Sequence, residues 1–363
     1  MTAVRVTWRQ VTRWRAGRQL LTRPEPDPVE IARRLTGIHA QVASSSVAIA
    51  AVRGGAGGGS ALDGPLWTDR TLVRTWAMRG TLHLLPADEL GLWTAALTDR
   101  ESRRRFPPSW EREHGVSGET LHAITAAIGR VLGAEPVVRA ELVERVCADL
   151  GRPEVAGPMA VSWGALLKPA AARGLLCSGP DGTFVSPAGW LGRPLDEWPA
   201  AEANEAVLLR FLAANGPATA ADVARWWGEQ PAPAKRWIKA APVLPVEVEG
   251  EPGFVVRAED ADELAAVPAA GEHPGDGPFL LPGFDPWVIA PRSHRERAVP
   301  EGREREVSRT AGWISPVLVV DGRVAGVWER TDCGPVTVRA FGPLPAATRK
   351  AVAERAGADL VWA

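Results

Sequence analysis

Residues 202–228, EANEAVLLRFLAANGPATAADVARWWG, decide the fold of this chain. They predict a helix, a Gly-Pro turn and a second helix, whose N-terminus Thr219 caps together with Asp222 three positions later. PAPAKRWIKAA (231–241) predicts a recognition helix, and LPVEVEGEPGFVVRAED (244–260) predicts a hairpin that turns at GEPG. Helices followed by a hairpin in this order are typical of a winged helix-turn-helix, which binds DNA, although an ordinary pair of helices is the alternative for any single unit.

The preceding stretch of the chain repeats this order. EPVVRAELVERVCADLG (135–151) predicts an amphipathic helix that ends at a glycine, and MAVSWGALLKPAAARGLLCSG (159–179) predicts a second helix. DGTFVSP (181–187) predicts a turn and a strand. We therefore assign a second winged helix to residues 116–198 and a third to residues 199–275.

The N-terminal part has a similar pattern. Helices are predicted over residues 3–36 and 67–77, and Pro28 suits a helix N-terminus. RGTLHLLP (79–86) predicts a short strand that Pro86 ends. Four apolar residues of the first helix are expected to share one face: Val6, Trp8, Val11 and Trp14. Residues 1–115 form the first predicted winged helix.

The last part of the chain changes to a β-rich pattern. Residues 278–345 predict a small sheet or barrel, and VLVV-DG-RVAGVW within them is a strong hairpin signal because of its Asp-Gly turn. Residues 345–360 predict a closing helix. The expected fold class is α+β, with three tandem winged helix-turn-helix units followed by a small C-terminal β-barrel over residues 276–363.

The overall composition excludes several classes of protein. The chain has 363 residues and is 45% hydrophobic, which predicts two to four domains. It contains no run of about 20 apolar residues, so no membrane span is expected. The N-terminus lacks the apolar core of a signal peptide. We expect a cytoplasmic, nucleoid-associated monomer.

Neither a metal nor a cofactor is expected from the sequence. Cys147, Cys177 and Cys333 lie far apart without a CxxC pair, so they predict no zinc site and no disulfide framework, and we expect small buried hydrophobic residues. GGAGGGS (54–60) predicts a flexible loop, but it has no GxGxxG or GK[ST] pattern, which excludes a nucleotide-binding loop.

Positive charge is clustered although the net charge is only −1. Nearly all of it is arginine, which suits bidentate contacts with phosphate. The clusters lie within residues 5–34, 100–112 and 292–309, and tryptophans interleave with the first two. A high-GC genome is the alternative explanation for the arginine bias, but it explains the clustering less well.

Four motifs, taken together, resemble the AlkZ-like (YcaQ-like) winged-helix DNA glycosylases. They are IHAQ near residue 40, MRGTLHLLPADE at 78–89, LLPGFDPWVIAPR at 280–292 and GWISPVLVVDGRVAGVW at 312–328, in the order of the family. The resemblance covers nearly the whole chain. It implies three winged helices that wrap double-stranded DNA in a concave surface, a C-terminal β-barrel, and monofunctional removal of alkylated purines, including bulky adducts and interstrand crosslinks.

The resemblance also implies where the chemistry occurs. The family's catalytic motif is Gln-x-Gln or Gln-x-Asp, and this chain has His39-Ala40-Gln41 at that place. Gln41 matches the second glutamine, and His39 replaces the first. The replacement of glutamine by histidine bears on both the mechanism and the substrate. Such a replacement is expected in a specialised subgroup of the family. Some relatives look like self-resistance enzymes that accompany pathways for DNA-alkylating natural products.

The residue types suit hydrolysis of an N-glycosidic bond. An N7- or N3-alkylated purine is cationic and leaves without a strong general acid, so the enzyme mainly has to place a water molecule and stabilise charge. On an extended segment, His39 and Gln41 would point the same way and hold one water between them. Gln41 would orient this water and a neutral His39 would also accept its proton, although His39 is equally interpretable as a structural histidine. No lysine lies near the motif, which predicts a hydrolase without lyase activity.

Further site residues are predicted with alternatives. His83 lies in RGTLHLL and would face the same pocket or be a half-exposed wing residue; Arg79 would contact a phosphate or form a surface salt bridge. Residues 292–309 contain six arginines and four glutamates. They predict either a solvated loop or a hairpin that approaches the minor groove. The candidate DNA contacts there are Arg292, Arg295, Arg297, Arg303 and Arg305. Asp285 is interpreted as a turn-forming residue before Pro286.

The function predicted from these observations is a monofunctional DNA glycosylase for alkylated purines, with bulky N7-guanine adducts or crosslinks as substrates. The alternatives are a non-catalytic winged-helix DNA-binding protein or transcriptional regulator, and a scaffold whose winged helices bind other proteins. Preference for alkylated DNA would favour the enzyme, sequence-specific binding would favour the regulator, and salt-insensitive or absent DNA binding would favour the scaffold.

Overall fold

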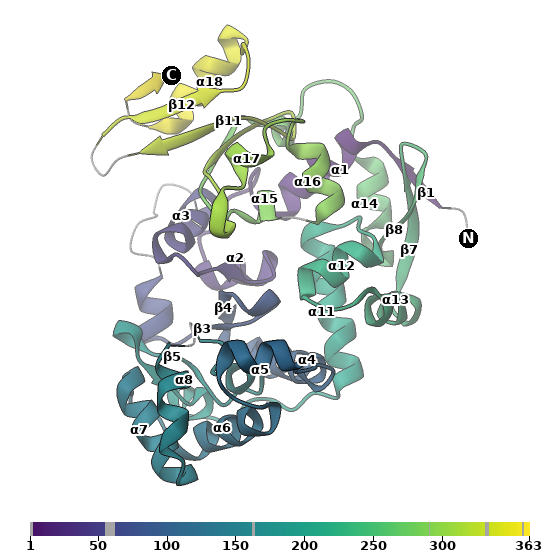
Figure 1. Ribbon diagram of the computed structural model, residues 1–363. Coiled ribbons are helices and arrows are strands. Elements are labelled where there is room, and N and C mark those ends of the chain that lie inside the picture. Colours follow the sequence, from purple (N-terminus) through teal and green to yellow (C-terminus); the bar gives the residue numbers. More distant parts are fainter. Residues whose placement is uncertain (1–2, 55–61, 162–163, 290, 331–333, 358) are drawn as a thin grey trace. The chain divides into compact units, whose positions relative to one another are not determined.

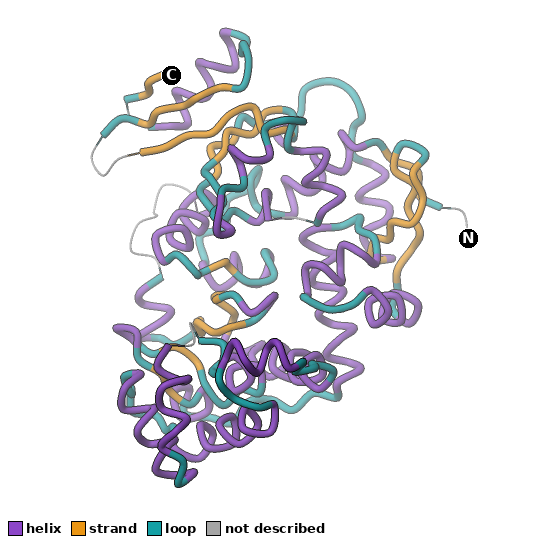
Figure 2. The backbone as a smooth tube through the Cα atoms, in the orientation of Figure 1, coloured by secondary structure: helices purple, strands orange, loops and turns teal. Residues whose placement is uncertain are grey.

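The computed structural model describes residues 3–54, 62–161, 164–289, 291–330, 334–357 and 359–363. Cys333 and most of the loop 54–60 lie outside the described residues. The chain forms two compact units, one made of residues 1–61 with 208–363 and the other of residues 62–207. Both contain helices and strands (Figures 1 and 2), so the predicted α+β class is confirmed. Among the described residues, no helix combines the length and apolar character that crossing a membrane requires.

The first unit combines both ends of the chain. Its N-terminal elements are β1 (Val4–Val6), α1 (Trp8–Arg18), α2 (Pro28–Arg34), β2 (Ile38–His39) and α3 (Ala43–Gly54). After α11 (Ala200–Asn215), which crosses the boundary between the units, the helices are α12 (Ala220–Trp227), α13 (Pro231–Ala240), α14 (Ala261–Ala266), α15 (Pro286–Ile289), α16 (Arg292–Ala298), α17 (Glu304–Val307) and α18 (Ala346–Ala356). The strands are β7 (Val243–Val248), β8 (Glu251–Arg257), β9 (Phe279–Leu281), β10 (Val317–Val320), β11 (Arg323–Arg330), β12 (Val336–Ala340) and β13 (Leu360–Trp362).

The segment that decides the fold has the predicted elements. Thr219 caps α12 in a capping box with Asp222, and Gly228 ends the helix in the left-handed conformation. Helix α13 and the hairpin β7–β8 follow. A shared core joins them, formed by Phe211, Leu212, Val223, Ala224 and Ala234. Each helix and strand expected over residues 202–260 is confirmed, and the interpretation as a winged helix stays a prediction.

The N-terminus begins with a strand rather than with the predicted helix. β1 pairs in parallel with β7, with Val4 opposite Val246, and adds a third strand to the β7–β8 hairpin. A three-residue strand whose partner is 242 positions away carries no local signal, which is why helices were expected from residue 3. The predicted apolar face is confirmed for Trp8, Val11 and Trp14 of α1, whereas Val6 lies in β1 and packs in the same core with β7, β8 and α14.

The C-terminal strands form an open sheet in the order β13-β12-β11-β10-β9. The Asp321-Gly322 hairpin is confirmed, and both residues have the positive φ values (50° and 75°) of its turn. The predicted barrel is not confirmed. Helices already cover both faces of the sheet, since Ala16 and Trp287 pack on one side and Val352 of α18 on the other, so its apolar surface is buried without closure.

The second unit is mainly helical. Its helices are α4 (Leu90–Ser102), α5 (Pro108–His114), α6 (Gly118–Val131), α7 (Arg139–Leu150), α8 (Ala156–Val161), α9 (Lys168–Ala172) and α10 (Pro187–Leu191). Its strands are β3 (Leu72–Trp76), β4 (Leu82–Pro86), β5 (Cys177–Ser178) and β6 (Phe184–Val185). The predicted helix that ends at Gly151 and the predicted strand over 79–86 are confirmed as α7 and β4.

Two predicted helices of this unit are wrong. Residues 72–76 of the predicted helix 67–77 form β3, because β-branched and aromatic residues (LVRTW) pair antiparallel with β4. The predicted helix 159–179 is broken into α8 and α9. Gly164 between them has φ +81°, and a Cβ there would lie 2.7 Å from the ring of Trp76, so this backbone path accepts only glycine.

Candidate active site

The predicted catalytic segment links β2 to α3 in the first unit. Ile38 and Ala40 are fully buried and His39 is 7% exposed, whereas Gln41 is exposed on the bend that precedes α3. The strand ends at His39, so regular alternation does not extend to Gln41 and the two side chains differ in burial. The expected pair of side chains on one face of a strand is therefore revised to one buried ring and one exposed amide.

An aromatic chain leads away from His39. The imidazole stacks in parallel on Phe284, with ring centroids 5.0 Å apart and an interplanar angle of 1°. Phe284 in turn meets Trp313 edge to face, with centroids 5.2 Å apart and an angle of 78°. The exposed fractions are 8% for Phe284 and 46% for Trp313. The three rings thus extend from the buried imidazole of His39 to the solvent-exposed indole of Trp313.

Phe284 has a strained backbone conformation. Its φ is +60°, which is unusual for a bulky residue and costs on the order of 1–3 kcal/mol. The neighbouring Gly283 is required by space, because a Cβ there would lie 2.9 Å from the carbonyl oxygen of Ile314. Tight packing of this segment against residue 314 therefore fixes the ring of Phe284 between His39 and Trp313.

The hydrogen bonds of Asp285 hold this strained turn in place. Its carboxylate accepts two hydrogen bonds from Arg53, at 2.8 and 3.0 Å, and both side chains are fully buried. It also accepts a bond of 2.9 Å from the backbone nitrogen of Trp287, at the start of α15. The prediction of a turn-forming residue is confirmed, and the buried ion pair with Arg53 was missed because its partner is 232 positions away.

The predicted Arg-rich hairpin is wrong, because residues 292–298 and 304–307 form the helices α16 and α17. Two of the four glutamates of this run pair with its arginines at helical spacing. Arg292 pairs with Glu296 at 2.6 Å, and Arg303 pairs with Glu306 at 2.6 Å. Such spacings of three and four residues stabilise helices, which accounts for the helices in place of the predicted hairpin.

The other arginines of this run differ in exposure. Arg297 pairs with Glu251 of β8. Arg295 is half-buried and donates to Ser308, and burial followed by repulsion from Arg225 lowers its pKa. Arg305 is exposed on α17, and Arg309 is exposed in the segment after it. Solvent screens exposed ion pairs, so the pairs of α16 and α17 contribute little to stability.

Two predicted residues belong to the second unit. Arg79 is exposed at the turn between β3 and β4, where it has φ +53°. His83 lies on β4 opposite Thr75 and is 6% exposed, so it is not the half-exposed residue of the alternative interpretation. Its Nδ1 lies 2.9 Å from the carbonyl oxygen of Thr81.

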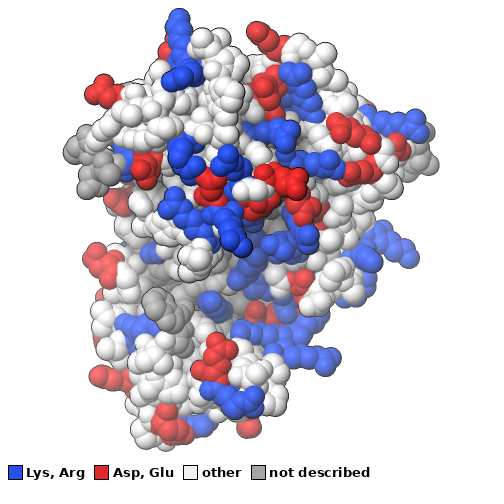
Figure 3. Space-filling model, turned by 45° about the horizontal axis from the view of Figure 1, so that its top comes forward, with Lys and Arg blue, Asp and Glu red and all other residues white. Residues whose placement is uncertain are grey.

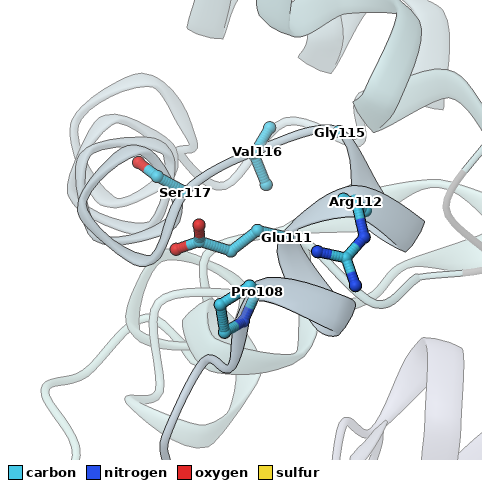
Figure 4. Close-up of a pocket in the computed structure, with 6 residues that line it drawn as sticks. All are labelled: Pro108, Glu111, Arg112, Gly115, Val116 and Ser117. Atoms are coloured by element: carbon cyan, nitrogen blue, oxygen red, sulfur yellow. The ribbon is translucent and has the colours of Figure 1, made fainter.

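The Arg- and Trp-rich region near residue 110 forms a half-buried aromatic cluster around α5. The indole of Trp110 stacks on His114 with centroids 4.3 Å apart, and the guanidinium of Arg104 lies over the rings of Phe106 and Trp110. An open depression of about 370 Å³ adjoins α5 and contains Glu111 and Arg112 (Figure 4). None of the site residues predicted from the sequence lines it.

The charge on the surface is mixed in sign. Figure 3 shows Lys and Arg side chains interspersed with Asp and Glu on the face that it displays. This agrees with a net charge of −1 and with the ion pairs of α16 and α17. The molecule therefore has no strong overall electrostatic field, and positive charge is concentrated in local groups of arginine.

Comparison with known proteins places the chain among the DNA glycosylases, enzymes of DNA repair that act on damaged DNA. It belongs to the DNA glycosylase AlkZ-like family, whose sequence pattern matches residues 32–362. It is 36% identical, over 91% of its length and 89% of the relative's, to the interstrand DNA cross-link repair glycosylase of Streptomyces sahachiroi. Its structure is similar to that of the Streptomyces sahachiroi DNA glycosylase AlkZ, with a TM-score of 0.89, 34% identity and coverage of 99% of both chains.

Proposed function

We propose that this glycosylase hydrolyses the N-glycosidic bond of alkylated purines, and that bulky N7-guanine adducts or interstrand crosslinks are its substrates. The observation that carries the proposal is the 36% identity, over 340 residues, to an interstrand DNA cross-link repair glycosylase. The proposal includes a role in self-resistance to a DNA-alkylating natural product.

In this proposal Gln41 orients the attacking water, and His39 holds the same water and accepts its proton. Gln41 is exposed and can meet the DNA, so it orients the water that attacks the sugar carbon. His39 lies two positions earlier with its ring clamped on Phe284, so it stays in place as the purine leaves. In the first 167 residues of the chain there is no lysine, which supports hydrolysis without a Schiff-base step.

The DNA contacts complete the proposal. Three winged helices, over residues 1–115, 116–198 and 199–275, hold double-stranded DNA, and the protein acts as a monomer. Arginine side chains contact the phosphates: Arg79, Arg292, Arg295, Arg297, Arg303 and Arg305. The exposure of Arg79 and Arg305 supports these contacts, and displacement of surface ion pairs frees Arg292, Arg297 and Arg303.

Release of damaged bases tests the proposal. Duplexes that carry N7-alkylguanine adducts of graded size are incubated with the protein, and abasic sites are detected by alkaline cleavage. We expect release of the larger adducts, and we expect Gln41→Ala to lower the single-turnover rate by about 100-fold or more. Arg130→Ala, which removes an exposed ion pair with Asp149, is the control for an unrelated surface change. Tight binding without release of any adduct would contradict the proposed activity.

A second variant addresses the departure from the family motif. His39→Gln restores the Gln-x-Gln motif and introduces an amide that can orient water. If His39 accepts the proton of the attacking water, His39→Gln should lower the single-turnover rate by about 100-fold, because an amide cannot act as a base. An unchanged rate would assign His39 a positioning role instead.

A further inference from the structure

The segment 307–315 presents one exposed tryptophan on a fixed turn. The backbone nitrogen of Arg309 donates to the carbonyl of Trp313 at 2.8 Å, and the nitrogen of Trp313 donates to Thr310 at 3.3 Å. Ser315 fastens the far end, because its nitrogen donates to the carbonyl of Val307 and its hydroxyl to that of Glu306. The exposure of Trp313 is thus a feature of an ordered turn.

Backbone conformation and packing both aim the indole at the candidate active site. Ala311 and Gly312 have φ values of +55° and +76°, which reverse the chain directly before Trp313. The indole then contacts Phe284, which is itself held at a positive φ with its face on His39. A strained residue that links an exposed aromatic side chain to the catalytic segment is the kind of outlier that marks a functional contact.

The chemical surroundings of Trp313 suit a planar cation attached to DNA. Arg309 in the same turn is exposed and can meet a phosphate, and no carboxylate occurs between residues 307 and 320. An indole face attracts cations and stacks on aromatic rings. Phe284 separates Trp313 from His39, so the indole lies one aromatic ring away from the segment that carries the chemistry. A methyl group on the purine has no aromatic face, whereas a planar substituent has one on which the indole can stack.

We propose that Trp313 is a specificity-determining residue that stacks on the planar aromatic substituent of an alkylated purine, with Phe284 as the residue that positions it. This inference rests on the proposed function, since it assumes that the excised base is an alkylated purine. It adds the substrate class: adducts with a planar aromatic group are preferred over adducts that carry only a methyl group.

Two cationic lesions of different size test this inference. One duplex carries 7-methylguanine, the other an N7-guanine adduct with a planar polycyclic substituent, and an unmodified duplex is the reference. Trp313→Ala should lower both the release and the binding of the polycyclic adduct about tenfold, because the variant has no ring on which the substituent can stack. Release of 7-methylguanine should change less than about threefold, since that lesion has no planar substituent for the indole to contact. Trp313→Phe should retain most of the preference.

Trp198→Ala is the matched control, because Trp198 is an exposed tryptophan of the other unit. Equal losses on both lesions with Trp313→Ala, or no loss on either, would overturn the inference. If the wild-type protein releases neither lesion, the proposed activity fails for both. The stacking role of Trp313 is then tested by the binding of the duplexes alone. A wild-type preference for the polycyclic duplex that Trp313→Ala abolishes supports the stacking role, and equal wild-type affinity for the polycyclic and unmodified duplexes refutes it.

Discussion

The arginines of the first unit fall into two groups that the sequence does not distinguish. Arg13, Arg15 and Arg53 of α1 and α3 are at most 1% exposed, whereas Arg292 and Arg305 of α16 and α17 lie in solvent. Arg13 and Arg15, like Arg292 and Arg305, belong to stretches rich in arginine. The difference shows that arginine density alone does not identify a DNA-binding surface, because the N-terminal cluster is partly a structural core.

The buried arginines of α1 connect this helix to residues 276–287. Arg13 donates to Asp276 at 2.6 and 2.7 Å. Arg15 donates to the carbonyls of Pro286 and Trp287 and lies over the ring of Trp287 at 4.4 Å. Burial lowers the pKa of Arg15 to about 9, with repulsion from Arg53 adding to the effect, so Arg15 stays charged at neutral pH. These contacts fasten α1 to residues more than 260 positions away.

The largest effect is expected at the buried ion pair. Arg53→Met leaves the carboxylate of Asp285 buried without its partner, which should lower the free energy of unfolding by about 3–5 kcal/mol. Urea denaturation measures this change. Adding Asp285→Asn removes the stranded charge and keeps an acceptor for the nitrogen of Trp287, so the double variant should be more stable than Arg53→Met alone. A loss below about 1 kcal/mol in the single variant would show that the pair contributes no more than an exposed one.

The next effect concerns His294, a buried histidine of helix α16. Burial lowers its pKa from 6.5 to about 4, and repulsion from Arg15 contributes. Its Nε2 donates to the carbonyl of Pro217 at 2.7 Å, which places the proton of the neutral ring on Nε2. Between pH 6.5 and 4 the unfolded chain binds a proton that the folded protein does not. The free energy of unfolding should therefore fall as the pH is lowered through this range, by on the order of 3 kcal/mol.

Urea denaturation at several pH values from 4 to 7 measures the effect of His294. His294→Gln keeps a donor for Pro217 and does not titrate, so it should lose less stability between pH 6.5 and 4 than the wild type. Identical pH dependence in the two proteins would assign the acid sensitivity to other groups.

What the sequence predicted, and what it did not, follows from the range of the interactions. The capping box at Thr219 and the Asp321-Gly322 turn depend on neighbouring residues, and both were predicted correctly. Strand β1 depends on Val246, so it was missed. The α16 and α17 helices were missed although their Arg–Glu spacings are local, because the run was interpreted by its charge alone.

The candidate site shows the same limit. His39, Gln41 and Asp285 were identified from motifs, but the ring contacts of Phe284 and the pairing of Asp285 with Arg53 were not. A phenylalanine with positive φ has no sequence signal, because its conformation is imposed by the packing of Gly283 against residue 314. The motifs GFDPW and GWISPV mark the segments, and only the structure joins them.

A smaller effect is expected at the exposed arginines that follow α16. Arg305→Gln with Arg309→Gln should weaken binding of duplex DNA about equally for all sequences, and it should lower the slope of log affinity against log salt by about one for each phosphate that the variant no longer neutralises. Fluorescence anisotropy at several salt concentrations measures both quantities. Arg130→Gln combined with Arg145→Gln, two exposed arginines of the other unit, is the control. An unchanged salt slope in the Arg305/Arg309 variant would remove these residues from the DNA interface.

The smallest effect completes the comparison between buried and exposed arginines. Arg292 pairs with Glu296 in solvent, with side-chain exposures of 68% and 59%, so Arg292→Ala should leave the free energy of unfolding almost unchanged. The same urea titration that measures Arg53→Met resolves this difference. A loss comparable to that of Arg53→Met would mean that the Arg292–Glu296 pair holds α16 in place, and α16 itself would then contain both structural and DNA-facing arginines.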